Sequence, residues 1–172
     1  MNKLAVTVGF STTNKWISRL IRWITRGEAS HAWLAFDDPS LGVRFVMQAE
    51  AWAVELRPWD RWKTENLLVD QYELVGPDAD EAVRWAVKQY VGAEYDYRAA
   101  LLAGLWRWFG RWIRGKFNSP KKLMCAEVVI RTLQHAGYFS VEHFDPETTA
   151  PKRLRARVME VPDQYREVVP NA

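Results

Sequence analysis

The chain has 172 residues, a length typical of one domain and sufficient to bury about 70% of the surface that the unfolded chain exposes. Its formal net charge is +3, a mild and dispersed excess, so we do not expect a nucleic-acid partner. A single cysteine excludes an intramolecular disulfide. The cysteine and the three histidines do not have the spacing of zinc ligands, so we predict no metal and no cofactor. Signal-peptide and membrane-spanning patterns are absent, which predicts cytoplasmic synthesis and leaves the final location open.

The first elements are a predicted strand over residues 3–10 and a helix that ends near Gly27. Ser11, Thr12 and Thr13 are candidates for the N-cap of that helix. Its apolar stripe consists of Trp16, Ile17, Leu20, Ile21 and Ile24. Arginines and a lysine lie mostly off this stripe, so the helix is amphipathic and basic, either as the solvated face of a packed helix or as an anionic or membrane-surface face.

A hairpin follows, with His31 at the entrance of its first strand. Residues 30–36 and 43–51 have strand patterns, and the turn composition of residues 37–42 separates them. Side chains alternate along a strand with a period of two, so Gln48 and Glu50 lie on one face. Either side chain is therefore a candidate partner for a group on the neighbouring strand.

The middle of the chain mixes strands and helices. The chain continues through residues 54–58 and a polar loop that carries tryptophans to a predicted strand over residues 67–75, and a helix begins near Asp78 and ends at Val91-Gly92. Residues 148–157 form a short basic helix by the same criteria. We find no repeat or linker and predict one α+β domain over residues 1–172, an antiparallel sheet packed against helices.

A tryptophan- and arginine-rich helical segment is predicted at about residues 97–116. Basic residues interleaved with aromatic ones, among them Trp106, suit single-stranded nucleic acid, a membrane interface or the roof of an apolar substrate cleft. The same tryptophans also suit an insertion packed on the core. These alternatives remain open from the sequence.

The single cysteine, Cys125, lies in a helix with an apolar stripe that Gly137 closes as a left-handed C-cap. Ser119-Pro120 favours a helix start more than a turn before the thiol, whereas a start near Leu123 puts the thiol in the first turn. A first-turn thiol is easier to ionise, because the helix N-terminus and nearby lysines favour the thiolate. A lone cysteine on an apolar stripe is otherwise a core residue.

A cysteine nucleophile needs a base and a group that orients the base. His135 is ten residues further along the same helix, about 15 Å away, and His143 lies in a loop. His31 stands at a strand entrance, with Gln48 or Glu50 on the next strand to hold its second ring nitrogen. We therefore predict a site of Cys125, His31 and one of these two polar residues.

These residues resemble a known family. Ser30-His31 opening a strand, the strand with Gln48 and Glu50, Tyr95-Asp96, Cys125-Ala-Glu-Val-Val and the helix of Thr149 to Leu154 are similar to circularly permuted papain-like hydrolases of the NlpC type. In that family the histidine precedes the cysteine in the chain. The resemblance covers residues 6–154 through short motifs, and it implies a cysteine helix packed against an antiparallel sheet that carries the histidine.

The resemblance implies a thiol hydrolase, with Cys125 as nucleophile and His31 as base and acid. The Cys125 backbone amide would be one oxyanion donor. Relatives cleave peptidoglycan peptides or lipid acyl groups and include lecithin:retinol acyltransferase-like enzymes. Trp106 suits the lipid branch, whereas Tyr95 and Tyr97 suit a peptide cleft.

The alternative is a non-catalytic structural or assembly module of the same fold. It would dock on a virion, envelope protein or membrane surface through the tryptophan-rich segment. A phage particle or lysis system would carry such a chain, or a hydrolase that acts on peptidoglycan, to the envelope.

Overall fold

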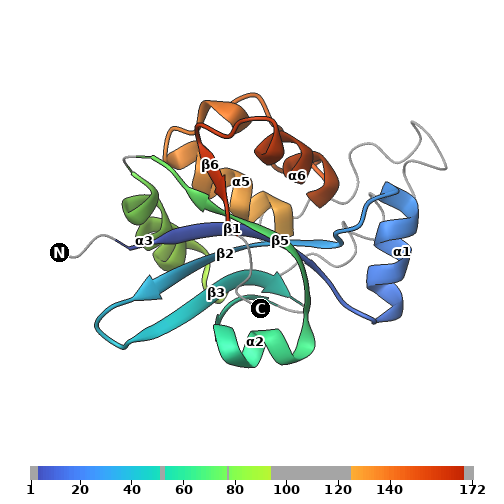
Figure 1. The fold of residues 1–172 in the computed structure, drawn as a ribbon, viewed down its shortest axis with the longest axis horizontal. Helices are drawn as coiled ribbons and strands as arrows, with labels where there is room; N and C mark the ends of the chain where they lie inside the picture. Colours follow the sequence, from blue (N-terminus) through green and yellow to red (C-terminus); the bar gives the residue numbers. More distant parts are fainter. Residues whose placement is uncertain (1–3, 51–52, 77, 94–124, 169–172) are drawn as a thin grey trace.

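The computed structural model describes residues 4–50, 53–76, 78–93 and 125–168. Their central feature is a six-stranded sheet in the order β4-β3-β2-β1-β5-β6, in which every neighbouring pair is antiparallel (Figure 1). The strands are β1 (Val6–Thr12), β2 (His31–Asp38), β3 (Val43–Glu50), β4 (Ala53–Pro58), β5 (Leu67–Leu74) and β6 (Tyr165–Glu167). With the helices below, this confirms the predicted α+β class.

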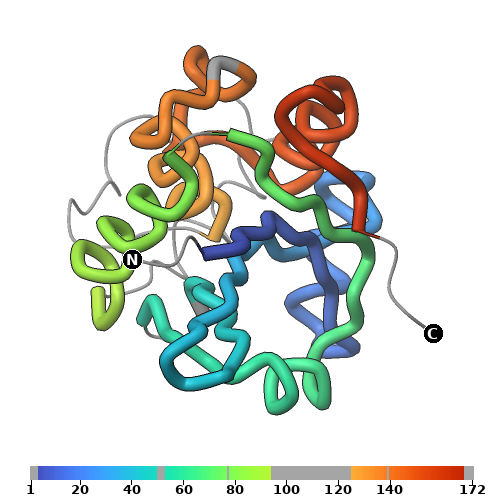
Figure 2. Tube along the Cα trace, turned by 60° about the vertical axis from the view of Figure 1, so that its left-hand side comes forward, coloured from blue at the N-terminus to red at the C-terminus, as the bar shows by residue number. Residues whose placement is uncertain are grey.

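Five α-helices surround this sheet within the described residues: α1 (Trp16–Thr25), α2 (Trp59–Glu65), α3 (Ala79–Tyr90), α5 (Cys125–His135) and α6 (Pro151–Met159). A short 3₁₀ helix, η2 (Phe139–Val141), precedes α6. Helix α5 packs on β2 and β3, α3 packs against α5, and α2 packs on β3 and β4. Figure 2 shows α3 and α5 side by side, with α2 at the opposite side of the sheet.

The two faces of the sheet bury different residues because strand side chains alternate. On β2, Ala32 and Leu34 belong to the main core beneath α3 and α5. Trp33 and Ala35 belong to a second cluster on the other face, together with Trp62 of α2. Each strand of the hairpin therefore packs against apolar residues on both faces of the sheet.

Gly9 of β1 permits the close approach of Trp33. A Cβ atom at position 9 would overlap the fully buried Trp33 indole. Trp33 in turn packs edge-on against Trp59 and Trp62, with ring centroids 5.6 and 4.9 Å away. Because Gly9 has no side chain, Trp33 can lie close to β1, and α2 can pack on Trp33.

The predicted N-cap at Ser11, Thr12 and Thr13 is wrong. Ser11 and Thr12 extend β1, because both pair with β5 and Ser11 also pairs with His31. Lys15 is the N-cap residue of α1, and its side chain makes no capping hydrogen bond. The pairing of β1 with its two neighbouring strands therefore delays the start of α1.

The predicted loop between β4 and β5 is also wrong, since its tryptophans lie on helix α2. Trp62 is buried, and Trp59 stacks on it at a centroid distance of 5.0 Å. The apolar contacts with Trp33 stabilise this short helix, which its polar composition alone does not indicate. The last strand, β6, was likewise not predicted as a separate element.

Other expectations are confirmed. Helix α3 begins at Ala79 after Asp78, and Gly137 has a positive φ of 76° after α5. Helix α1 ends at Thr25, and its C-cap residue Arg26, with a φ of 51°, lies one residue before the predicted Gly27. The segment at about residues 97–116 lies outside the described residues. Among the described helices, none has the length and apolar character needed to cross a bilayer.

Candidate active site

His31 and Gln48 meet at one end of the sheet. His31 is the first residue of β2, and Gln48 lies near the end of β3, which runs antiparallel to β2. Antiparallel pairing brings the start of one strand to the end of the next. The His31 Nε2 atom lies 3.2 Å from Gln48 Oε1. The predicted contact between His31 and this strand therefore forms through the carboxamide.

Two further partners determine the orientation of the Gln48 amide. The Trp62 indole Nε1–H donates to Gln48 Oε1 over 2.8 Å. Gln48 Nε2 donates to Glu55 Oε1 over 3.1 Å. An indole N–H only donates and an ionised carboxylate only accepts, so the amide oxygen must face Trp62 and the amide nitrogen must face Glu55.

This orientation determines the protonation of His31 as well. Because Gln48 Oε1 accepts, His31 Nε2 carries the proton that it donates. Nδ1 is then the ring nitrogen that is left to interact with the thiol. A histidine with one nitrogen fixed as donor and the other turned to a thiol is arranged as a general base.

Cys125 is the first described residue of α5 and contacts His31. Burial raises the pKa of the Cys125 thiol. The charge and hydrogen bond of the His31 imidazole, with the backbone amides of Ala32 and Ala126, outweigh burial and hold this pKa below its ordinary value. The arrangement favours a thiolate beside an imidazolium.

The backbone amide of Ala126, the next residue of α5, is one of the contacts that lower the pKa of the Cys125 thiol. Residues 119–124, which decide between the two predicted helix starts, lie outside the described residues. Cys125 is 8% exposed and is counted among the buried residues of the main core.

The other predicted site residues have different outcomes. Glu50 closes β3 and pairs with Ala53, but its side chain is outside the described part of the chain, so its contribution stays a prediction. Tyr95, Tyr97 and Trp106 lie outside the described residues. The structure thus brings together Cys125, His31 and Gln48.

Sequence reasoning missed Glu55 and Trp62, which hold Gln48. The hairpin of β3 and β4 pairs Gln48 directly with Glu55, so a predicted register would have identified that carboxylate. Trp62 could have been identified only if the residues of α2 had been predicted to form a helix. Its helix arises through packing with Trp33, a contact that local sequence does not reveal.

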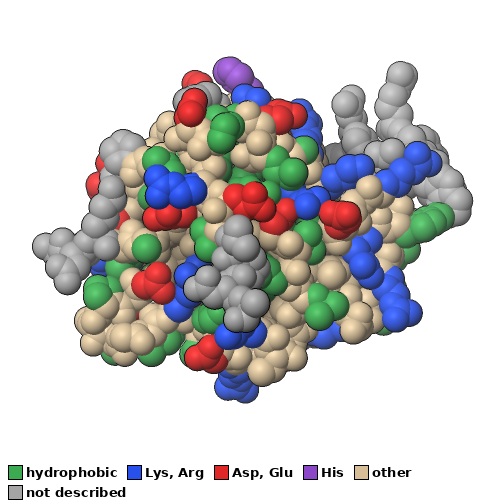
Figure 3. Space-filling view, viewed as in Figure 1, with side chains coloured by type: hydrophobic (Ala, Val, Ile, Leu, Met, Phe, Trp, Pro, Cys, Tyr) green, Lys and Arg blue, Asp and Glu red, His purple; other side chains and the backbone are tan. Residues whose placement is uncertain are grey.

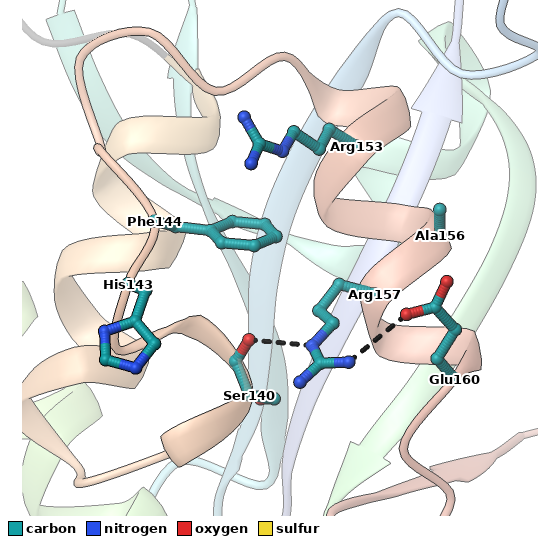
Figure 4. Close-up of a pocket in the computed structure, with 7 residues that line it drawn as sticks. All are labelled: Ser140, His143, Phe144, Arg153, Ala156, Arg157 and Glu160. Carbon is teal, nitrogen blue, oxygen red and sulfur yellow. Dashed lines mark hydrogen bonds and ion pairs between the residues drawn. The ribbon is translucent and has the colours of Figure 1, made fainter.

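The remaining histidines lie elsewhere. His135 stacks on Trp85 with ring centroids 4.0 Å apart. His143 lines a separate hollow of about 380 Å³ between η2 and α6, shown in Figure 4. Within it, the Arg157 guanidinium donates to the Ser140 backbone carbonyl and pairs with Glu160. Neither Cys125 nor His31 lines this hollow.

Metal ligands are not gathered in the part of the chain that the structure describes. No three side chains of histidine, cysteine, aspartate or glutamate come together there. Cys125 and His31 supply two such groups, and the third partner, Gln48, is a carboxamide engaged by Trp62 and Glu55. These residues do not fit a metal held by three protein ligands.

Comparison with known proteins identifies a fold neighbour and no family. No protein-family model matches the chain, and no curated protein matches it with significant similarity. Among solved structures, the chain is similar to a protein described as metalloprotein YiiX, DUF1105, from Escherichia coli O157:H7. The TM-score is 0.57 at 15% identity, over 98% of this chain and 97% of that one. The likeness supports the overall fold.

Proposed function

We propose that this protein is a thiol hydrolase that cleaves an amide or ester bond through an acyl-enzyme on Cys125. The observation that carries the proposal is the continuous set of contacts from Cys125 through His31 to Gln48. It contains a nucleophile whose pKa is lowered, a base with a defined donor nitrogen and a group that orients the base. The sequence resemblance to NlpC-type hydrolases assigns the same roles to Cys125 and His31.

The chemistry follows from these positions. The Cys125 thiolate attacks the carbonyl carbon, a C–S bond forms, and the carbonyl π electrons move to oxygen. The intermediate collapses as the amide or ester bond breaks, and imidazolium Nδ1–H gives its proton to the leaving nitrogen or oxygen. Water then attacks the thioester, His31 takes a proton from it, and the thiolate leaves with the carboxylic acid released.

Gln48 keeps the imidazole in the required tautomer throughout this cycle. Its Oε1 atom accepts from Nε2 in both the neutral and the protonated state of His31, so proton exchange is confined to Nδ1. The fold neighbour YiiX is described as a metalloprotein. The cycle proposed for this chain is built on Cys125, His31 and Gln48.

The substrate class follows from the resemblance and is either a peptidoglycan peptide or a lipid acyl group. Both carry an acyl carbon bonded to nitrogen or oxygen, and both suit an acyl-enzyme. We expect the acyl group on the enzyme to distinguish them, because a fatty acyl chain and a peptidyl fragment differ in mass.

A second candidate is the non-catalytic module of the same fold. The low exposure of Cys125 favours it, since a buried thiol is inert toward a large substrate. The contact with His31 favours the enzyme, because a cysteine that only fills the core needs no imidazole partner. The two candidates differ in a measurable property, the formation of a thioester.

The test is to incubate the full chain with peptidoglycan fragments, phospholipids and simple acyl esters, and to measure both turnover and the mass of the quenched protein. The hydrolase forms a thioester on Cys125 and releases acid at a rate that Cys125→Ala abolishes. The control variant Thr132→Val removes a buried hydroxyl from the same helix and retains activity. Equal turnover by Cys125→Ala would show that the nucleophile is wrong, and absence of any adduct across the panel would favour the module.

A further inference from the structure

Helix α1 has an unusual relation to the body of the protein. Within α1, all of whose residues are described, the one buried side chain is the polar Ser18, whose hydroxyl is bonded to Thr13 over 2.7 Å. The apolar residues of the helix are instead half-buried or exposed, and Trp16 and Trp23 are 70% and 65% exposed. An amphipathic surface helix normally buries its apolar stripe against the core. None of the apolar residues of α1 belongs to the two described core clusters.

The positions of these residues around the helix form one continuous surface. At 100° per residue, the six apolar residues occupy an arc of about 160°, with Trp16 and Trp23 at its border. The basic residues Arg19 and Arg26 lie next to that border. Aromatic rings between an apolar arc and cations are typical of helices that lie in a membrane interface.

The charge of this surface has a single sign. Residues 15–26 contain four basic residues and no acidic residue. The next acidic side chain, Glu28, is paired with Arg155 at 2.9 Å. Figure 3 shows lysine and arginine side chains gathered at the end of the molecule where α1 lies. This surface is complementary to an anionic one.

The ends of α1 are attached to the body, so the helix presents a fixed face. Lys152 of α6 donates to the Arg26 carbonyl over 2.8 Å at the C-terminal end. Shortly after Arg26 the chain reaches His31, whose backbone pairs with Ser11 at the end of β1. Helix α1 therefore lies at the end of the sheet where the active site is built.

We propose that α1 docks the protein on an anionic lipid surface, with Trp16 and Trp23 inserted at the headgroup level and its arginines on the lipid phosphates. Tryptophan rings partition to this boundary because one part is apolar and the indole N–H is polar. The basic residues supply the attraction to anionic lipid. Such docking brings the sheet end that carries His31 close to the membrane.

The proposal is independent of thiol chemistry, and the test keeps the two separate. Flotation of the full chain is measured with phosphatidylcholine vesicles, with and without phosphatidylglycerol, at low and high salt. We expect binding that requires phosphatidylglycerol and weakens with salt. Cys125→Ala should bind as well as the wild-type protein, so failure of the hydrolase proposal leaves this result unaffected.

Variants of α1 and matched variants elsewhere identify the docking face. Arg19→Glu should weaken binding about tenfold or more, whereas Arg61→Glu on α2 makes the same change of charge away from α1 and should have a much smaller effect. Trp16→Ala should weaken binding about tenfold, and Leu41→Ala, an exposed apolar residue of the β2–β3 turn, should not. Circular dichroism checks that each variant is folded.

Three results would overturn the proposal. The first is vesicle binding that does not respond to the α1 variants. The second is α1-dependent binding to single-stranded DNA without vesicle binding, which makes the face a nucleic-acid site. The third is α1-dependent self-association, seen by sedimentation, without vesicle binding, which makes the face an interface between two copies.

Discussion

Gln48 is held by three side chains at once, and this explains why a carboxamide can orient the histidine. Its oxygen accepts from His31 and Trp62, and its nitrogen donates to Glu55. Glu55 is itself paired with Arg57 at 3.1 Å. Every polar atom of the side chain has a partner whose role is determined by its chemistry. The imidazole therefore contacts an acceptor that cannot rotate without the loss of several hydrogen bonds.

The first prediction concerns this residue. Gln48→Ala should lower kcat/KM by about ten- to a hundredfold, because His31 loses the group that fixes its ring. It should also lower the free energy of unfolding by about 1–3 kcal/mol, since the buried Trp62 indole N–H loses its acceptor. Steady-state kinetics and urea unfolding measure the two effects.

Gln71→Ala is the matched control for Gln48→Ala. Gln71 is also a buried glutamine, but it lies on β5 and pairs with Gly9. This variant should lose stability and keep kcat/KM near the wild-type value. If Gln48→Ala affected only stability, as Gln71→Ala does, the orienting role of Gln48 would be excluded.

At the scale of elements, the packing of α2 on the sheet depends on the lack of a side chain at Gly9. Gly9→Ala should lower the free energy of unfolding by about 2–3 kcal/mol, because the new methyl group overlaps the Trp33 indole. Since Trp33 packs against Trp62, the displacement should also weaken the hold on Gln48. Thermal or urea unfolding, with thiol reactivity as a second readout, checks the prediction.

Gly42→Ala provides a contrast. Gly42 has a φ of 63° in the β2–β3 turn, and no atom lies within 4 Å of a Cβ placed there. Its substitution should cost about 1 kcal/mol through backbone strain alone and leave thiol reactivity unchanged. An effect of Gly9→Ala no larger than that of Gly42→Ala would show that the Trp33 contact is not tight.

An ion-pair network ties α6 to β5 and to the connection between α1 and β2. Arg155 contacts Asp70 at 2.6 Å and Glu28 at 2.9 Å. Burial raises the pKa of Asp70, and the Arg155 guanidinium opposes that effect. The Asp70 side chain is 11% exposed, so its carboxylate needs this partner.

Arg155→Met should therefore lower the free energy of unfolding by about 2–3 kcal/mol at neutral pH, because it leaves a buried carboxylate without its cation. The loss should shrink as the pH falls, since the raised pKa of Asp70 lets the carboxyl group protonate in the folded state. Urea unfolding at neutral and acidic pH measures this. The exposed pair of Arg166 and Glu73 supplies the control, and Arg166→Met should change stability by less than about 1 kcal/mol. A pH-independent loss in Arg155→Met would exclude the charge as its cause.

At the scale of the whole molecule, the sequence predicts the hairpin and the cysteine helix because their patterns are local. The period-two alternation of β2 and β3 places Gln48 at the end of the sheet that carries His31. The sheet order is not local. β1 pairs with β5 across more than fifty residues, and this pairing converts Ser11 and Thr12 from predicted caps into strand residues.

In the candidate site, too, some residues can be predicted from the sequence and others depend on long-range packing. Cys125 and His31 can be identified by elimination among few candidates, whereas the choice between Gln48 and Glu50 is open from the sequence because both lie on one strand face. The structure places Gln48 against His31. Trp62 is out of reach of sequence reasoning, because its position depends on the packing of three tryptophans from β2 and α2.

The most direct test of the central claim is the pH dependence of alkylation of Cys125 by iodoacetamide in the full chain. A lowered thiol pKa predicts that the rate persists below the ordinary cysteine pKa of about 8.5 and falls only as the pH drops through the lowered value. His31→Gln removes the favourable charge and leaves the burial, so its rate at pH 6 should fall by at least about tenfold. Equal profiles for the two proteins, both with an ordinary or raised pKa, would contradict the thiolate–imidazolium pair.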